Sequence, residues 1–283
     1  MVSLALPPLL TLAVHESLLA ARAAGARFVE CSLDLGLSST RVAITADAWV
    51  WNQHSFPYLE RCRDRSVYSW IDSNFQPLAR FSTSLIKLVT SAWGPPTFEI
   101  DGIKMLPTAR VSPYEDARLK VALIEPRGKQ VLDTCGGLGY FAAWCLRGGA
   151  TRVQSFEKNA DVLWLRTLNP WSPDSPWSQL DRRALELTQA DVTQVIGDLG
   201  AGSIDAVLHD PPRFGIAGEL YSQQFYDQLA RVLKSRGRLF HYTGSPNKVS
   251  RGRDLAQEVC GRLERAGFKA ALQGDGVLAH KRR

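Results

Sequence analysis

The stretch Val131-Leu132-Asp133-Thr134-Cys135-Gly136-Gly137-Leu138-Gly139-Tyr140 decides the fold of this chain. An apolar run ends in a carboxylate, a glycine-rich turn follows, and a helical pattern begins directly after it. Glycine lets the backbone approach a ligand closely, and the free N–H groups at the start of a helix face that ligand. The stretch therefore predicts a strand, a ligand-binding turn and a helix, although tight strand-to-helix turns also use glycine for structural reasons alone.

The same alternation of strand and helix continues to the end of the chain. It predicts a mostly parallel sheet with helices on both faces. The last two strands are joined by Gly274-Asp275-Gly276 instead of a helix, so we expect them to form an antiparallel hairpin. We expect strands at residues 130–134, 151–156, 184–189, 203–209, 237–242, 268–272 and 276–281, and helices at residues 138–146, 159–168, 191–199, 218–234 and 250–266.

The first part of the chain has a different pattern. Residues 9–24 have apolar positions at helical spacing and end at Gly25, a candidate C-cap. Short β-favouring runs separated by Gly, Pro, Asn and Asp then predict hairpins of a small antiparallel sheet at residues 26–35, 41–51, 66–71, 78–89 and 97–105. We therefore divide the chain into a helix plus β-rich domain, residues 1–108, and an α/β domain, residues 109–283. From its position alone, the first domain is expected to select the substrate.

Composition places the 283 residues among soluble globular proteins, with 45% hydrophobic and 22% charged residues. Pro7-Pro8 interrupts the apolar start of the chain, so neither a membrane span nor a signal peptide is expected, and we expect a cytoplasmic protein. The five cysteines form no CxxC pair, which argues against disulfides and against a metal site. The net charge of +6 permits an anionic partner such as RNA.

Two classes of cofactor use such a glycine turn. Gly137-x-Gly139-x-x-Ala142 fits the loose dinucleotide pattern, with Glu157 about 20 residues further on to hold a ribose. S-adenosylmethionine (SAM) sites share the geometry, with the first acid facing the ammonium of the cofactor and the second acid on the ribose. Asp133 would repel a pyrophosphate, the turn lies in mid-chain, and the sheet ends in a hairpin. All three observations favour SAM.

Residues 130–283 thus resemble the class I SAM-dependent methyltransferases, a Rossmann-like fold whose sheet ends in an antiparallel hairpin. By this resemblance Asp191 would contact the adenine amino group, although it could equally be a helix N-cap. The cofactor-binding residues that the resemblance implies are Asp133, Thr134, Cys135, Gly136, Gly137, Gly139, Glu157, Lys158 and Asp191.

A second signature, Val207-Leu208-His209-Asp210-Pro211-Pro212-Arg213-Phe214, ends the fourth expected strand of the sheet. It resembles the (Asp/Asn)-Pro-Pro-aromatic motif of enzymes that methylate amino nitrogens. The resemblance implies that Asp210 and the Pro211 carbonyl accept hydrogen bonds from the target N–H. Arg213 stands where the family has the aromatic residue, and Phe214 follows one position later. Arg213 could instead clamp a phosphate or carboxylate.

Further residues are expected to border the substrate. Tyr221, His241 and Tyr242 follow or end strands beside this motif, with core packing as the alternative. The basic run that includes Arg251 and Arg253 precedes a predicted helix and is expected to bind an anion.

Shorter motifs resemble a little-characterised family of predicted methyltransferases best represented in archaea. They lie at residues 33–38, 98–103, 217–221, 240–244 and 250–254. A β-rich domain ahead of a SAM-type fold also resembles the spermidine synthases.

The sequence therefore predicts a SAM-dependent methyltransferase acting on an amino nitrogen of RNA, or of a small amine or anionic substrate. Three alternatives stay open. They are an aminopropyltransferase using decarboxylated SAM, a non-catalytic RNA-binding protein and, more distantly, a nicotinamide dehydrogenase.

Overall fold

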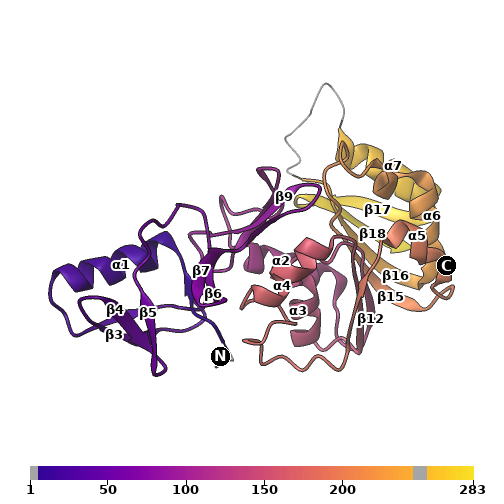
Figure 1. The fold of residues 1–283 in the computed structure, drawn as a ribbon. Helices are drawn as coiled ribbons and strands as arrows, with labels where there is room; N and C mark the ends of the chain where they lie inside the picture. Colours follow the sequence, from indigo (N-terminus) through magenta and orange to yellow (C-terminus); the bar gives the residue numbers. More distant parts are fainter. Residues whose placement is uncertain (1–5, 245–253) are drawn as a thin grey trace. The chain divides into compact units, whose positions relative to one another are not determined.

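A computed structural model describes residues 6–244 and 254–283 of the chain. It forms two compact units, drawn in one ribbon in Figure 1. Unit 1 runs to Glu115 and also contains Trp164–Ser178, and unit 2 contains Asp116–Leu163 and Gln179–Arg283. The sequence did not indicate that Trp164–Ser178 belongs with the first unit. The substrate-selecting role of residues 1–108 stays a prediction.

Unit 1 contains antiparallel strands, as expected, but they form three small sheets and not one. Each hairpin pairs chiefly with its neighbours in sequence, in the orders β1-β6-β7, β2-β3-β4-β5 and β11-β10-β9-β8. The elements are β1 (Leu9–Leu10), α1 (Leu12–Ala23), β2 (Phe28–Cys31), β3 (Thr40–Ile44), β4 (Ala48–Trp51), β5 (His54–Pro57), β6 (Tyr68–Ile71), β7 (Asn74–Pro77), β8 (Ala79–Phe81), β9 (Leu85–Val89), β10 (Thr97–Ile100) and β11 (Ile103–Lys104).

The helix of unit 1 starts three residues later than predicted. Leu9 and Leu10 pair with β6 and extend one of the small sheets, and Thr11 then caps the helix by accepting a hydrogen bond from Val14 N. At the other end Gly25 adopts the left-handed conformation (φ +63°) just after the C-cap Ala24, as a helix stop requires. The rings of Trp49 and Phe56 stack at 4.5 Å in the core of this unit.

Unit 2 has the predicted Rossmann-like sheet, in the strand order β14-β13-β12-β15-β16-β18-β17. The first five of these strands are mutually parallel, and β17 and β18 form the predicted antiparallel hairpin. This is the fold that the sequence predicts for residues 130–283. The strands are β12 (Gln130–Asp133), β13 (Arg152–Glu157), β14 (Leu185–Gln189), β15 (Ile204–His209), β16 (Leu233–Tyr242), β17 (Phe268–Gln273) and β18 (Gly276–Lys281).

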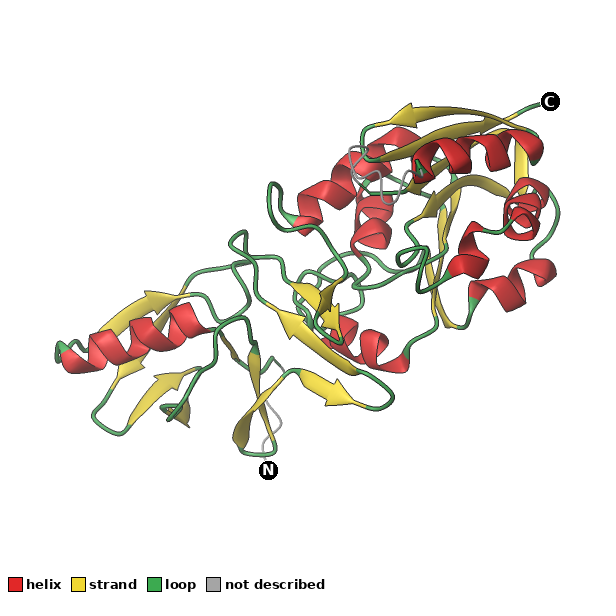
Figure 2. Ribbon diagram, turned by 90° about the horizontal axis from the view of Figure 1, so that it is seen from above, coloured by secondary structure: helices red, strands yellow, loops and turns green. Residues whose placement is uncertain are grey.

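Helices cover both faces of this sheet, as the turned view in Figure 2 shows. Most of the predicted helices are present, but the sequence did not indicate α2, whose residues from Asp116 onward belong to unit 2. The helices are α2 (Pro113–Ile124), α3 (Tyr140–Arg147), α4 (Ala160–Leu168), α5 (Val192–Val195), α6 (Gln223–Val232) and α7 (Leu255–Arg265), with short 3-10 helices η1 (Ile196–Asp198) and η2 (Gly218–Tyr221).

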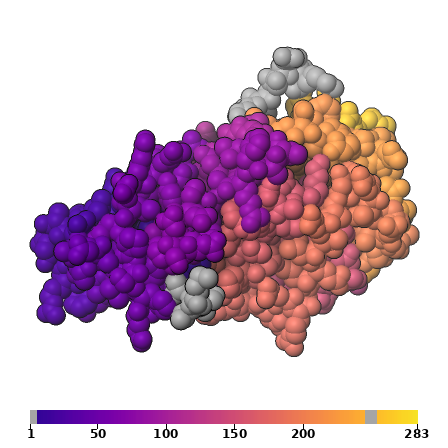
Figure 3. All heavy atoms as spheres, in the orientation of Figure 1, coloured from indigo at the N-terminus to yellow at the C-terminus, as the bar shows by residue number. Residues whose placement is uncertain are grey.

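The core of unit 2 explains where α6 begins and ends. Ser222 caps the helix by accepting from Phe225 N, and the buried residues Phe225, Tyr226 and Leu229 recur at helical spacing against the sheet. The helix stops at Val232, two residues before the predicted end, because Leu233 already pairs with Ile204 in β16. Figure 3 shows that side chains fill the spaces between the ribbons of unit 2.

The order of the strands reverses direction at β12. From β12 the chain moves outward to β13 and β14, and then returns to the other side of β12 to form β15. Open α/β sheets bind ligands at the carboxyl ends of the strands where the order reverses in this way. In the described part of the chain no helix is long and apolar enough to span a membrane.

We expect Gly276→Ala to destabilise the sheet. A Cβ atom at Gly276 would lie 2.3 Å from the carbonyl oxygen of His241 and 2.7 Å from Cζ of Phe240. That carbonyl belongs to β16 and can move only if the pairing of β16 with β18 is disturbed. The free energy of unfolding should fall by about 1–3 kcal/mol or more, measured by urea denaturation.

The matched control is Gly197→Ala, because a Cβ there meets no atom within 4 Å. This variant should stay within about 0.5 kcal/mol of the wild type. Equal denaturation midpoints for the two variants would contradict the close packing of β16 against β18.

Candidate active site

The carboxyl ends of the five parallel strands lie at one edge of the sheet. β12 and β13 end at Asp133 and Glu157, and β15 and β16 end at His209 and Tyr242. Most of the predicted site residues stand at or just after these positions. The parallel register thus brings together residues that are up to about a hundred positions apart in the sequence.

The glycine turn after β12 is held by hydrogen bonds to the neighbouring strand β13. Gly137 and Gly139 have φ angles of +48° and +79°, which favour glycine. Gly136 N donates to the Phe156 carbonyl at 2.7 Å, and Gly137 N donates to Oε2 of Glu157 at 3.0 Å. The predicted second-strand acid therefore fixes the shape of the predicted turn.

Glu157 is also tied to the helix that follows it. Its Oε1 accepts from Asn159 N at 2.9 Å, so both carboxylate oxygens accept backbone N–H groups. A carboxylate oxygen can accept more than one hydrogen bond, so this type of group can also accept from ribose hydroxyls. The geometry holds the carboxylate in one orientation beside the turn.

Asp133 lies deeper than its predicted role implies. Its side chain is fully buried, and Oδ2 accepts from the Ser155 hydroxyl at 2.8 Å. Direct contact of this carboxylate with an ammonium group stays a prediction. In this structure Asp133 supports the base of the turn and joins β12 to β13.

Thr134 and Cys135 connect the turn to β15. Thr134 N donates to the Leu208 carbonyl at 3.1 Å, and the Thr134 hydroxyl lies 2.7 Å from Nδ1 of His209. Burial, with Glu157 nearby, raises the pKa of the Cys135 thiol well above its ordinary value. A thiol that stays protonated is a poor nucleophile, which agrees with a binding position for Cys135 and not a catalytic one.

Lys158 and Asp191 approach each other at the end of the sheet. The Lys158 ammonium lies 3.6 Å from Oδ2 of Asp191 and 3.9 Å from Oε1 of Glu219. Asp191 is also the N-cap of α5, accepting from Thr193 N at 2.9 Å. The pKa of Asp191 is lowered because these contacts outweigh its burial. The capping role is therefore present, and the adenine contact stays a prediction.

Asp210 follows β15 and meets a lysine that the sequence did not indicate. Oδ2 of Asp210 lies 3.4 Å from the Lys120 ammonium on α2, and Oδ2 of Asp116 lies 2.7 Å from the same ammonium. The ammonium also lies 3.6 Å from the centre of the Tyr242 ring. Asp116 and Lys120 stand four residues apart in a helix, but no signal linked that helix to the Asp-Pro-Pro motif.

Burial and the neighbouring charges together set the ionisation of this cluster. The Asp210 side chain is 16% exposed, and its desolvation raises the pKa although Lys120 opposes the shift. The Lys120 side chain is 6% exposed; burial opposes its charge, but Asp210 and Asp116 together raise its pKa. The pKa of Tyr242 is raised, first by burial. At neutral pH Lys120 is therefore an ammonium ion.

The loop after Asp210 exposes two of the predicted residues. The hydroxyl of Tyr221, itself buried, donates to the Pro212 carbonyl at 3.1 Å and fixes the loop. The Phe214 ring is 38% exposed and packs edge-on against Tyr221, with ring centres 5.4 Å apart. The Arg213 side chain is exposed. Both residues are thus free of the core and accessible to a ligand.

His241 has surroundings that do not support direct substrate contact. Its ring is fully buried and lies 4.4 Å from that of His209, centre to centre. Nδ1 lies 3.0 Å from the Tyr242 carbonyl, and Nε2 lies 2.9 Å from the Tyr226 hydroxyl. The packing alternative therefore fits His241, while its neighbour Tyr242 reaches the candidate site. The predicted anion-binding residues Arg251 and Arg253 lie outside the described residues.

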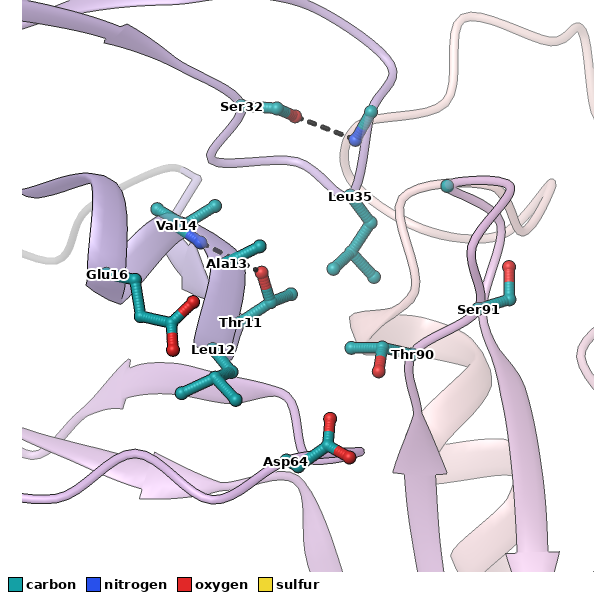
Figure 4. Close-up of a pocket in the computed structure, with 12 residues that line it drawn as sticks. Thr11, Leu12, Ala13, Val14, Glu16, Ser32, Leu35, Asp64, Thr90 and Ser91 are labelled. Atoms are coloured by element: carbon teal, nitrogen blue, oxygen red, sulfur yellow. Dashed lines mark hydrogen bonds between the residues drawn. The ribbon is translucent and has the colours of Figure 1, made fainter.

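A separate cavity of about 360 Å³ lies in unit 1 at the start of α1 (Figure 4). Its lining includes Thr11, Leu35 and Ser91, and the carboxylates of Glu16 and Asp64, but no basic side chain of the described residues. None of the predicted site residues lines it. The cavity therefore has no part in the site at the sheet edge.

Comparison with known proteins supports the fold. No family model matches the chain. An uncharacterized protein of Methanocaldococcus jannaschii, MJ1233, is 45% identical over 193 residues, which cover 67% of this chain and 65% of that protein. The chain therefore matches about 65% of the length of this relative.

Solved structures resemble the chain at low identity. The spermidine synthase of Thermotoga maritima gives a TM-score of 0.54 at 15% identity, covering 72% of this chain and 71% of that one. A spermidine synthase in complex with the transition-state analogue AdoDATO gives 0.54 at 16% identity, covering 72% and 70%. At such identities the likeness is one of fold. The TYW2 protein of M. jannaschii in complex with AdoMet gives 0.43 at 18% identity, covering 74% and 91%.

We expect the buried His209 to make the protein less stable in mild acid. Nε2 of His209 lies 3.0 Å from the Leu220 carbonyl and donates to it, so in the neutral ring Nδ1 accepts from the Thr134 hydroxyl. Burial lowers the pKa of His209 to about 4, whereas an unfolded histidine has a pKa near 6.5. The unfolded state therefore binds more protons below pH 6.5, and stability falls as the pH falls towards 4.

His209→Gln isolates this contribution, measured by urea denaturation at pH 7.5 and pH 5. The wild type should be more stable than the variant at pH 7.5, and that advantage should shrink by about 2 kcal/mol at pH 5. An advantage that is the same at both pH values would show that the ring does not remain neutral in the folded protein.

Proposed function

We propose that this protein is a SAM-dependent methyltransferase that acts on an amino nitrogen. The observation that carries the proposal is the position of Asp210. Its carboxylate follows β15, the strand paired with β12, and β12 leads into the glycine turn held by Glu157. A ligand in the turn and an acceptor at Asp210 would therefore meet across the reversal of strand order.

The residues of the turn fit SAM. Gly137 and Gly139 offer a close backbone approach, and Glu157 offers acceptors to a ribose. Lys158 and Asp191 lie beside each other at the next strand, where the adenine would be bound. When bound, SAM supplies an electrophilic methyl group on a sulfonium ion. The chain supplies alignment, since proximity and orientation account for much of the acceleration of such a reaction.

Asp210 is proposed to orient the acceptor. Its carboxylate and the Pro211 carbonyl accept hydrogen bonds from the acceptor N–H, which turns the nitrogen lone pair towards the cofactor. The raised pKa of Asp210 makes it a stronger base than an exposed aspartate, so it can take the proton that the nitrogen loses.

The proposed acceptor is an amino group on RNA, with a small molecule as the second choice. Phe214 presents a partly exposed ring on which a base can stack, and Arg213 offers a charged fork to a phosphate or carboxylate. The net charge of +6 favours a polyanion.

A second candidate is transfer of an aminopropyl group from decarboxylated SAM to a polyamine. The fold likeness to spermidine synthases favours it.

The experiment that tests the proposal uses methyl-labelled SAM and an extract of cells that lack this protein. Label in large, ribonuclease-sensitive material supports RNA as the acceptor. Label in the small-molecule fraction supports a small-molecule acceptor. Transfer from decarboxylated SAM to a polyamine, with none from SAM, favours the second candidate. RNA binding without transfer from either donor favours a non-catalytic RNA-binding protein.

In this assay we expect Asp210→Ala to lose at least 100-fold in the rate of methyl transfer, because the acceptor N–H and the departing proton lose their partner. SAM binding, measured by calorimetry, should change less than threefold. Asp181→Asn changes an exposed carboxylate that pairs with nearby Arg183; it is the control and should retain full activity. Wild-type turnover in Asp210→Ala would remove Asp210 from the mechanism.

We expect Glu157→Gln to weaken SAM binding by roughly 10- to 100-fold, since charge-assisted hydrogen bonds contribute about 1.5–3 kcal/mol. The amide has one acceptor oxygen in place of two, so either Gly137 N or Asn159 N loses its partner and the turn loosens. Glu186→Gln, on the neighbouring strand β14 and exposed, should bind SAM like the wild type. Equal affinity of the Glu157 and Glu186 variants would contradict the assignment of the turn.

A further inference from the structure

The Lys120 ammonium is enclosed on three sides in unit 2. Carboxylate oxygens of Asp116 and Asp210 lie 2.7 and 3.4 Å from Nζ, and the Tyr242 ring centre lies 3.6 Å away. The Phe141 ring, just after the glycine turn, adds an aromatic wall at 5.7 Å. Only 6% of the lysine side chain is exposed.

These partners match the hydrogen-bonding capacity of an ammonium ion. An ammonium has three N–H donors and no acceptor, and here two carboxylates and the face of one aromatic ring surround it. The same groups would bind the end of any alkylammonium ligand. Lys120 therefore occupies a position whose surroundings suit a cationic amine.

Asp210 retains an oxygen for another partner. Lys120 approaches Oδ2, and among the described residues none donates a hydrogen bond to Oδ1 of Asp210. The two carboxylates and the ammonium together carry a charge of −1, whereas the carboxylates alone would carry −2. Oδ1 of Asp210 can therefore accept a hydrogen bond from the substrate, and it lies next to the Lys120 ammonium, which Asp210 already binds through Oδ2.

We propose that Lys120 is a specificity-determining residue, whose ammonium occupies the cation place formed by Asp116, Asp210 and Tyr242 and so restricts the acceptor to a neutral amino group. The restriction to a neutral acceptor rests on the proposed methyl transfer at Asp210. The occupation of the cation place by Lys120 does not depend on it.

The selection follows from charge. An alkylammonium acceptor would have to be desolvated beside the buried Lys120 ammonium, and like charges at close range in a poorly solvated site repel strongly. A neutral aromatic amine has no such cost and donates its N–H to Oδ1. The fold is shared with polyamine-using enzymes, but this occupied place argues against a polyamine acceptor.

Removing the lysine side chain beyond Cβ and supplying its missing atoms tests the proposal. In Lys120→Ala the atoms lost are those of n-propylammonium. We expect 50 mM propylammonium chloride to raise the melting temperature of Lys120→Ala by about 2–5 °C above its value in 50 mM sodium chloride. The wild type should show no such difference, and neither should Lys120→Ala in 50 mM n-propanol, which lacks the charge.

Activity gives a second reading that a purely structural lysine would not produce. With its natural acceptor, Lys120→Ala should lose at least tenfold in kcat and regain most of it in propylammonium, because the ammonium again orients Asp210. Lys120→Met fills the space without charge, so it should lose activity and show no rescue by propylammonium. Lys120→Ala should also become inhibitable by polyamines, which should not inhibit the wild type.

The outcomes separate the two proposals. Equal effects of propylammonium on the wild type and on Lys120→Ala, or equal rescue by n-propanol, would overturn the role of Lys120. If Lys120→Ala does not fold alone, refolding in propylammonium but not in sodium chloride supports the proposal, and failure in both overturns it. Propylammonium binding by Lys120→Ala, together with a wild type that transfers no methyl group, would reject the proposed function and retain the cation place.

Discussion

The parallel pairing of β12 with β15 is the constraint on which the rest of unit 2 depends. Val131 to Asp133 lie beside Ala206 to Leu208, and the hydrogen bond from Thr134 N to the Leu208 carbonyl carries the pairing into the turn. Without this register, the glycine turn and Asp210 would not share an edge of the sheet. The hydrogen bond between the Thr134 hydroxyl and the buried His209 ring then joins the two strand ends.

Much of this arrangement could be predicted because it depends on short-range patterns in the sequence. Glycines at positive φ, the capping residue Asp191 and the Asp-Gly hairpin each act within a few residues. The division of the unit 1 strands among three sheets and the burial of Asp133 could not be predicted in the same way. They depend on pairing and packing between distant segments. The local sequence around an aspartate at the end of a strand is the same whether the side chain is buried or exposed.

Lys120 shows the same limit at the site itself. Its helix carries Asp116 and Lys120 at the spacing of an ordinary exposed ion pair, which contributes little to stability. Only the tertiary structure brings Asp210 and the Tyr242 ring to the same ammonium and removes most of the water around it. An unremarkable surface pattern thereby becomes a buried cation next to the candidate acceptor site.

Because methyltransferases and aminopropyltransferases can share a fold, the fold does not identify the acceptor. The charge of the acceptor distinguishes the two reactions. Methyl and aminopropyl transfer both need a turn for the adenosyl group and a carboxylate near the acceptor nitrogen, so the geometry of Glu157 and Asp210 serves either one. The two reactions differ in whether the acceptor is brought as a cation. A site that keeps two carboxylates without an internal partner attracts polyamines, whereas this site already holds Lys120 between them. Separating that lysine from Asp210 would leave a buried, uncompensated charge, which is far more costly than breaking an exposed pair. The proposed acceptor, which brings an N–H group and no charge, fits beside such a pair.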